Sequence, residues 1–143
     1  AILAADAIVV GPGSLYTSLL PNLLVPDLVE AMRASRALKI FVCNVATQRG
    51  ETQGLTVGDH LRVLEEHVGG RLFDLVVVSQ RPEEALPEGV EWVEEEPDLA
   101  EDYAIYRAAL VDTLKPWRHD SIKLAQAVID LVEDRTGPLL DGG

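Results

Sequence analysis

The sequence predicts an α/β fold in which a mostly parallel sheet carries helices on both faces. Short apolar runs rich in β-branched residues are typical of strands buried on both sides, and three of them lie at 7–10, 39–42 and 75–78. Between and after these runs, apolar residues recur at the spacing of amphipathic helices. Strands that alternate with helices pair in parallel and place their connections on the faces of the sheet.

Length and composition limit the class of protein. The chain has 143 residues, 48% of them hydrophobic, which suffices for one domain with its own core. We therefore expect a single α/β domain over residues 1–143. Apolar runs fall short of the roughly 20 residues that span a bilayer, so we expect no membrane span. The formal net charge of -12, without a cluster of lysine and arginine, argues against nucleic acid as a partner.

The start of the chain is unusual for a domain boundary. Residue 1 is not methionine, and the apolar run 1–5 leads into the first predicted strand without a cap or turn signal. We therefore expect the chain to be the later half of a larger domain. Acidic residues gather between positions 83 and 102, and we interpret them as a solvated face. They show no metal-ligand spacing, so the sequence predicts no metal site there.

A glycine-rich turn follows the first predicted strand, which we expect to be central in the sheet. Gly11 and Gly13 permit positive φ or close backbone approach, and Pro12 removes one donor. Ser14 can cap a following helix, with Thr17 in its first turn. Free amide and hydroxyl groups at that point would stabilise a phosphate or carboxylate. The turn matches neither GxGxxG nor GxxxxGK[ST], so a purely corner-forming role stays open.

A second polar segment follows the second predicted strand. It runs over residues 43–54, longer than the usual 2 to 6 residues of such connections. Asn44 carries both a donor and an acceptor, which suits a base or sugar edge, although bonding to loop backbone is an equal alternative. The neighbouring polar residues suit hydroxyls or a hydrated cation, and they are Thr47, Gln48, Glu51 and Thr52.

The second polar segment is followed by residues that predict the start of a helix. Thr56 and Asp59 have the spacing of a capping box, which starts a helix that ends at Gly69-Gly70. Asp59 and His60 fall in its first turn, facing back toward the long loop. Taken singly, Asp59 can simply complement the helix dipole and His60 can simply pack.

The remaining elements complete the expected chain path. A helix after the first turn should stop at Pro21, and a new one should open at Pro26. Residues 90–93 alternate like a short edge strand, and 106–111 are read as a further strand. The last helix should begin near Asp120 and stop before Gly137-Pro138.

We interpret two groups that could be reactive, the Cys43 thiol and the His119-Asp120 pair, as structural. Cys43 lies in an apolar run, where a small buried side chain is the favoured reading over a reactive thiol. Asp120 is expected to cap the last helix, and His119-Asp120 has no matching nucleophile. The sequence therefore predicts no catalytic residue.

Several ordered blocks resemble the gluconeogenesis factor family, relatives of 2-phospho-L-lactate transferase (CofD-like). The blocks are 6–18, 20–24, 43–48, 50–52 and 119–125. The resemblance implies a Rossmann-like domain that binds a nucleotide or nucleotide-sugar, with bacterial members acting in the cytoplasm on carbon metabolism, cell-wall formation and hence cell shape. It places around the ligand the residues Gly11, Pro12, Gly13, Ser14, Asn44, Thr47, Gln48, Glu51 and Thr52, with Asp59 and His60 nearby. The family's amino-terminal glycine-rich turn and its Asp-Asp-Gly segment are not found in this chain.

Three functions follow from this reading. The preferred one is a regulatory protein that binds a UDP-sugar without turnover, because amides, hydroxyls and backbone donors suit recognition. The alternative is a transferase that moves a phospho-acid from a nucleotide-activated donor. That chemistry would use Mg²⁺, for which the candidate loops offer only the carboxylates of Glu51 and Asp59. The third is a structural half-domain in a homo-oligomer.

Overall fold

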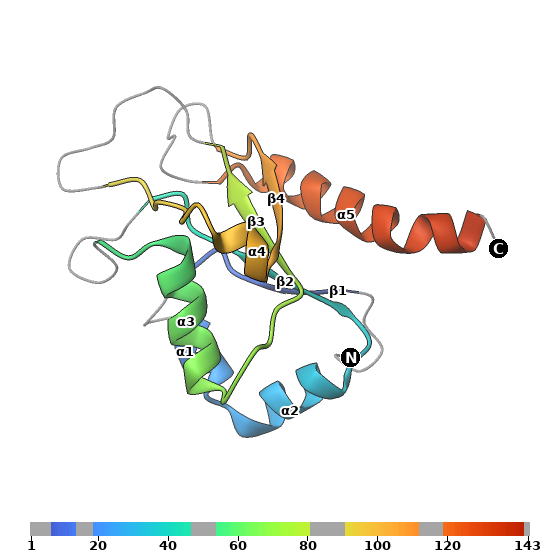
Figure 1. Ribbon diagram of the computed structural model, residues 1–143. Coiled ribbons are helices and arrows are strands. Elements are labelled where there is room, and N and C mark those ends of the chain that lie inside the picture. Colours follow the sequence, from blue (N-terminus) through green and yellow to red (C-terminus); the bar gives the residue numbers. More distant parts are fainter. Residues whose placement is uncertain (1–6, 14–18, 47–53, 81–90, 112–118, 142–143) are drawn as a thin grey trace.

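The computed structural model describes residues 7–13, 19–46, 54–80, 91–111 and 119–141 (Figure 1), and side chains in these ranges except Ser121 and those of 134–141. The elements run in the order β1 (Ala7–Val10), α1 (Leu20–Leu23), α2 (Pro26–Ala34), β2 (Leu38–Val42), α3 (Val57–His67), β3 (Leu75–Ser79), α4 (Leu99–Asp102), β4 (Ala104–Ala108) and α5 (Ser121–Asp141).

The described strands form one parallel sheet in the order β1-β2-β3-β4, so neighbours in sequence are neighbours in space. Val9 pairs with Ile40, Phe41 with Val76, and Val77 with Tyr106. A helical connection separates each strand from the next, as parallel pairing requires. The predicted α/β fold with a Rossmann-like parallel sheet is confirmed.

Two cores lie on the two faces of the sheet. On one face, Leu61 and Leu64 of α3 pack with Phe41 of β2 and Phe73, whose ring centroids are 5.4 Å apart. On the other face, α5 lays Leu131 and its apolar neighbours against β2 and β3. Figure 1 shows α5 running away from the sheet on the side remote from α1 and α3. Helices therefore cover both faces, as expected.

Strand β1 is at the edge of the described sheet, not in its centre as the sequence suggested. Its only neighbour among the described strands is β2, and the Val9 side chain is 41% exposed. The apolar run was a sound sign of a strand. The run could not show whether a strand pairs on one side or on both. Side chains point toward the two faces of a sheet, whereas neighbouring strands pair through the backbone within its plane.

Several boundaries also differ from the expectation. Pro21 lies in the first turn of α1 and does not end that helix, because the first backbone N–H groups have no helical partner to lose. Residues 14–18, where the expected helix would begin, lie outside the described residues. Helix α5 continues through Gly137-Pro138 to Asp141, since one proline removes only one helical donor. The expected strand at 90–93 reduces to a bridge between Ala46 and Trp92.

The fourth strand lies earlier than expected. β4 covers Ala104–Ala108 and not 106–111, because its register is set by pairing with β3 from Leu75 to Ser79. The expected starts of α2 at Pro26 and of α3 after Thr56 are confirmed. None of the helices in the described ranges is both long and apolar enough to cross a bilayer.

Candidate functional site

The turns after β1 and β2 are tied together by one side chain. Asn44 Oδ1 accepts a hydrogen bond from Gly13 N at 3.0 Å, and Asn44 Nδ2 donates to Gly13 O at 2.8 Å. Both residues follow the carboxyl ends of adjacent parallel strands, where α/β sheets bind ligands. We call this pair of hydrogen bonds the Asn44–Gly13 clasp.

Close backbone approach explains the glycine at position 11. Gly11 has a φ of +87°, and a Cβ added there would lie 2.4 Å from the carbonyl oxygen of Val42 at the end of β2. Any larger residue would push the turn away from β2. Pro12 follows with its ring exposed. The sequence therefore builds a turn that is held directly against the neighbouring strand.

The clasp changes the expected chemistry of the turn. The amide of Gly13 donates to Asn44 and is not a free donor, whereas the amide and hydroxyl groups expected from Ser14 onward lie outside the described residues. Asn44 combines both groups in one side chain, which is why it can satisfy an N–H and a C=O of the same residue. Among the described residues, the clasp uses one of the two Nδ2 hydrogens and one of the two Oδ1 lone pairs of Asn44.

Asp59 is engaged in capping α3. Its N–H donates to Thr56 Oγ1 at 3.1 Å, and its Oδ2 accepts from Thr56 N at 3.0 Å, which confirms the predicted capping box. Its other oxygen pairs with Arg62. The hydrogen bond from the Thr56 backbone, helped by Arg62, holds the pKa of Asp59 below its ordinary value. The carboxylate thus stabilises the start of the helix.

His60 is buried with one nitrogen unsatisfied. The residue is 1% exposed, and its Nδ1 lies 2.7 Å from the carbonyl oxygen of Thr56. This carbonyl can only accept, so Nδ1 carries the proton and Nε2 is a bare acceptor. Nε2 has no hydrogen-bond partner among the described residues. Burial lowers the pKa of His60, which keeps the ring neutral.

The remaining predicted site residues lie outside the described ranges. They are Ser14, Thr17, Thr47, Gln48, Glu51 and Thr52. Of the twelve candidates, the structure brings together Gly11, Gly13 and Asn44, and it places Asp59 and His60 in the first turn of α3.

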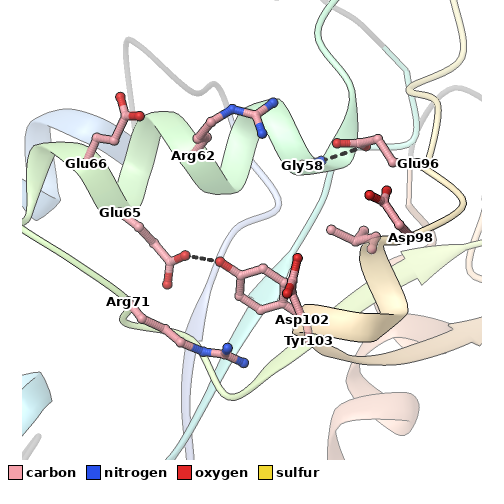
Figure 2. A pocket seen from close by; sticks show the side chains of 10 residues that line it. Gly58, Arg62, Glu65, Glu66, Arg71, Glu96, Asp98, Asp102 and Tyr103 are labelled. Carbon is pink, nitrogen blue, oxygen red and sulfur yellow. Dashed lines mark hydrogen bonds between the residues drawn. The ribbon is translucent and has the colours of Figure 1, made fainter.

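A pocket of about 550 Å³ on another side of α3 was not predicted from the sequence. Figure 2 shows it between α3 and the stretch that leads through α4 into β4. Tyr103 donates from its hydroxyl to Glu65 Oε1, and the Arg71 guanidinium lies 4.4 Å from the Tyr103 ring centroid. Burial, together with the Glu65 carboxylate, raises the pKa of Tyr103 to about 12.

Glu65 lines this pocket and is held by several hydrogen bonds. Its side chain is buried, and Oε2 also accepts from the backbone N–H groups of Leu72 and Phe73. At the other end, Glu96 Oε1 accepts from Gly58 N at 3.0 Å at the start of α3. A signal for Glu65 existed in the sequence, because a carboxylate stands in the buried stripe of α3 beside Leu61 and Leu64. These contacts hold the segment around α4 against α3.

The other reactive groups have structural surroundings. Cys43 is buried, as expected, and burial raises the pKa of its thiol. Asp120 Oδ1 accepts from Ile122 N and Lys123 N, so it caps α5. Burial lowers the pKa of His119 to about 4. Within the described ranges, no group of three or more His, Cys, Asp or Glu side chains could hold a metal ion.

A parallel α/β sheet with two turns joined at its carboxyl edge defines a class of proteins that bind small ligands at that edge. The model of the family "2-phospho-L-lactate transferase CofD" matches residues 1–134. The chain belongs to this family.

Individual relatives support the assignment. A gluconeogenesis factor from Halalkalibacterium halodurans is 38% identical over 140 residues, which is 91% of this chain and 43% of that protein. A gluconeogenesis factor from Listeria innocua is 40% identical over 141 residues, 94% of this chain and 44% of that protein. A crystal structure of a UPF0052-family protein from Bacillus halodurans superimposes with a TM-score of 0.78 at 37% identity, covering 90% of this chain and 44% of that one. The chain therefore spans less than half the length of these relatives.

Proposed function

We propose that the chain binds a nucleotide-sugar of the UDP-sugar class, as part of a cytoplasmic regulatory protein of the gluconeogenesis factor type that acts on carbon metabolism and cell-wall formation. The Asn44–Gly13 clasp is the observation that carries this proposal. It joins two turns at the carboxyl edge of the sheet, where α/β folds commonly bind ligands, and the second Nδ2 hydrogen and Oδ1 lone pair of Asn44 would serve the ligand.

The surroundings of the clasp favour recognition. The backbone around Gly11, Pro12 and Gly13 and the amide of Asn44 are neutral groups, which suit sugar hydroxyls and a uracil edge. His60 adds a buried neutral acceptor in the first turn of α3. Ser14, Thr17, Thr47, Gln48, Glu51 and Thr52 would complete the site from the two loops. Family membership and the names of the relatives also support the proposed function.

Binding without turnover is preferred because the described residues offer no nucleophile beside a positioned base. The Cys43 thiol is buried with a raised pKa, and the Asp59 carboxylate is engaged with Thr56 and Arg62. The family model's own description favours a second candidate, a transferase of a phospho-acid. That reaction would use Mg²⁺ to spread charge in the transition state.

Calorimetric titration of the chain with UDP-sugars, with and without Mg²⁺, tests the proposal, with released nucleotide measured by chromatography in the same samples. We expect saturable binding and no nucleotide release. Asn44→Ala should weaken binding at least about tenfold, since the clasp and the ligand contacts are lost together. Gln126→Ala removes an exposed amide that bonds Asp130 on α5 and serves as the matched control.

The outcomes separate the candidates. Nucleotide release that depends on Mg²⁺ would favour the transferase. Absence of binding, or equal affinity of the Asn44→Ala and Gln126→Ala variants, would remove the proposal.

A further inference from the structure

The four backbone N–H groups at the start of α3 all have partners. Two of them bond Thr56, through its hydroxyl and carbonyl oxygens. Val57 N donates to Glu94 O at 2.8 Å. Gly58 N donates to Glu96 Oε1 at 3.0 Å (Figure 2). A helix start holds phosphate with these same amides, so in α3 the chain's own oxygens occupy the position that an anion would take.

The carboxylate of Glu96 lies close against this helix start. A Cβ added to Gly58 would lie 1.8 Å from Glu96 Oε2, so glycine at this position admits the carboxylate. Its charge also reaches the groups beneath α3. Burial, and after it the negative charge of Glu96, raises the pKa of the Cys43 thiol, directly before Asn44 of the clasp. Burial lowers the pKa of His60, and the Glu96 charge opposes that shift.

Backbone contacts fix the segment that carries Glu96. Val93 N donates to Val45 O at 3.0 Å, one residue after Asn44. Glu94 O accepts from the first residue of α3. This short segment therefore contacts the clasp side and the α3 side of the candidate site. Because its backbone is held at both contacts, the Glu96 side chain starts from a fixed point beside α3.

We propose that Glu96 is a specificity-determining residue of the candidate site, which keeps phosphate groups away from the start of α3. A phosphate that approached Gly58 would find its amide occupied and would meet a carboxylate of like charge. The part of the ligand that lies against α3 is therefore uncharged, a sugar or a base, whose hydroxyl or N–H donors match the Nε2 acceptor of His60. This inference rests on the proposed function, because it assigns which part of a UDP-sugar lies beside α3.

The amide resonance of Gly58 tests the exclusion without any nucleotide. The isotopically labelled chain is titrated with inorganic pyrophosphate and followed by NMR. We expect the resonance to stay in place in the wild-type chain and in Glu96→Gln, whose amide oxygen still accepts from Gly58 N. In Glu96→Ala the position is open, and the resonance should shift saturably. Thermal unfolding of each variant confirms that it is folded.

Calorimetry with UDP-glucose measures the effect on a ligand of the proposed class. Glu96→Gln removes the charge and keeps the hydrogen bond, so the affinity for this anionic ligand should rise at least about threefold at low salt. The gain should shrink as sodium chloride is added, because salt screens the repulsion. Glu101→Gln removes an equal charge at an exposed position of α4 and should leave the affinity unchanged.

Three results would overturn the inference. One is a saturable shift of the Gly58 resonance when pyrophosphate is added to the wild-type chain. Another is a Gly58 resonance that stays in place in folded Glu96→Ala, since the position would then reject phosphate without Glu96. The third is equal affinity of Glu96→Gln and Glu101→Gln for UDP-glucose. If UDP-glucose binds none of these proteins, the proposed function fails, and the pyrophosphate titration still decides whether Glu96 closes the start of α3.

Discussion

Helix α3 carries two buried polar side chains whose surroundings differ. Glu65 is 7% exposed, and its two oxygens accept from Leu72, Phe73 and Tyr103. His60 is 1% exposed, and its Nε2 has no partner within the described part of the chain. Five residues of helix place them about 140° apart, on separate flanks. A satisfied buried group stabilises a fold, whereas the unsatisfied Nε2 calls for a partner, such as a water or a ligand, that the described residues do not supply.

Loss of the Glu65 carboxylate should have the largest effect on stability. Glu65→Ala leaves two backbone N–H groups and the Tyr103 hydroxyl without their acceptor, and we expect the free energy of unfolding to fall by about 3–5 kcal/mol. Urea denaturation measures this. Glu66→Ala, on the exposed next residue, should change it by less than about 0.5 kcal/mol. Equal effects at the two positions would show that the buried contacts are not stabilising.

Gly11→Ala should cause the next largest loss of stability. It changes the turn that the Asn44–Gly13 clasp joins to β2. Its Cβ would lie 2.4 Å from Val42 O at a φ of +87°, and we expect a loss of about 2–4 kcal/mol in denaturation. Gly54→Ala is the matched control: φ there is +81°, yet nothing lies within 4 Å of the added carbon. Only the backbone strain of about 1 kcal/mol should remain. A Gly11→Ala variant no weaker than Gly54→Ala would argue against the close approach.

The sequence predicted local features better than these contacts. The Thr56 and Asp59 capping box spans three residues, so its spacing alone identified it. Adjacent strand ends brought the Gly11–Gly13 turn near Asn44, but the exact hydrogen bonds between residues 31 apart depend on the sheet register. The apolar stripe of α3 marks Glu65 as a buried position, but its partners at 72, 73 and 103 could not be predicted, because other elements supply them. The edge position of β1 depends on neighbours that no single strand encodes.

Acid should weaken the fold through the buried histidines. The pKa of His119 is about 4 in the folded chain and 6.5 ordinarily, so between these values the unfolded chain binds more protons. Stability is therefore complete above about pH 6.5 and falls as the pH drops toward 4. The lowered pKa of His60 acts in the same direction.

Replacement of His119 isolates its share of this loss. His119→Asn should remove up to about 3 kcal/mol of the decline between pH 6.5 and 4, measured by urea denaturation across that range. Ile122→Ala, at an 82% exposed position without a titratable group, is the control and should retain the original profile. Identical profiles for all three proteins would assign the acid loss to groups other than His119.

Substitution of His60 should lower the stability least among these variants. It tests directly whether the two buried polar side chains of α3 have different roles. Its Nδ1 shares the Thr56 carbonyl with the His60 backbone N–H, so that oxygen stays satisfied when the ring is replaced. We expect His60→Phe to lower the free energy of unfolding by about 1 kcal/mol, the cost of one hydrogen bond and some repacking. On the proposed function, in which Nε2 accepts a hydrogen bond from the ligand, UDP-sugar affinity should also fall about tenfold.

His67 supplies the control for that substitution. Its Nδ1 bonds the Val63 carbonyl four residues earlier at 2.7 Å, as His60 bonds Thr56, but on the exposed end of α3. His67→Phe should leave both stability and affinity unchanged. If His60→Phe instead unfolds the chain as severely as Glu65→Ala, then both buried groups on α3 are structural, and the ligand contact must be sought at Asn44 alone.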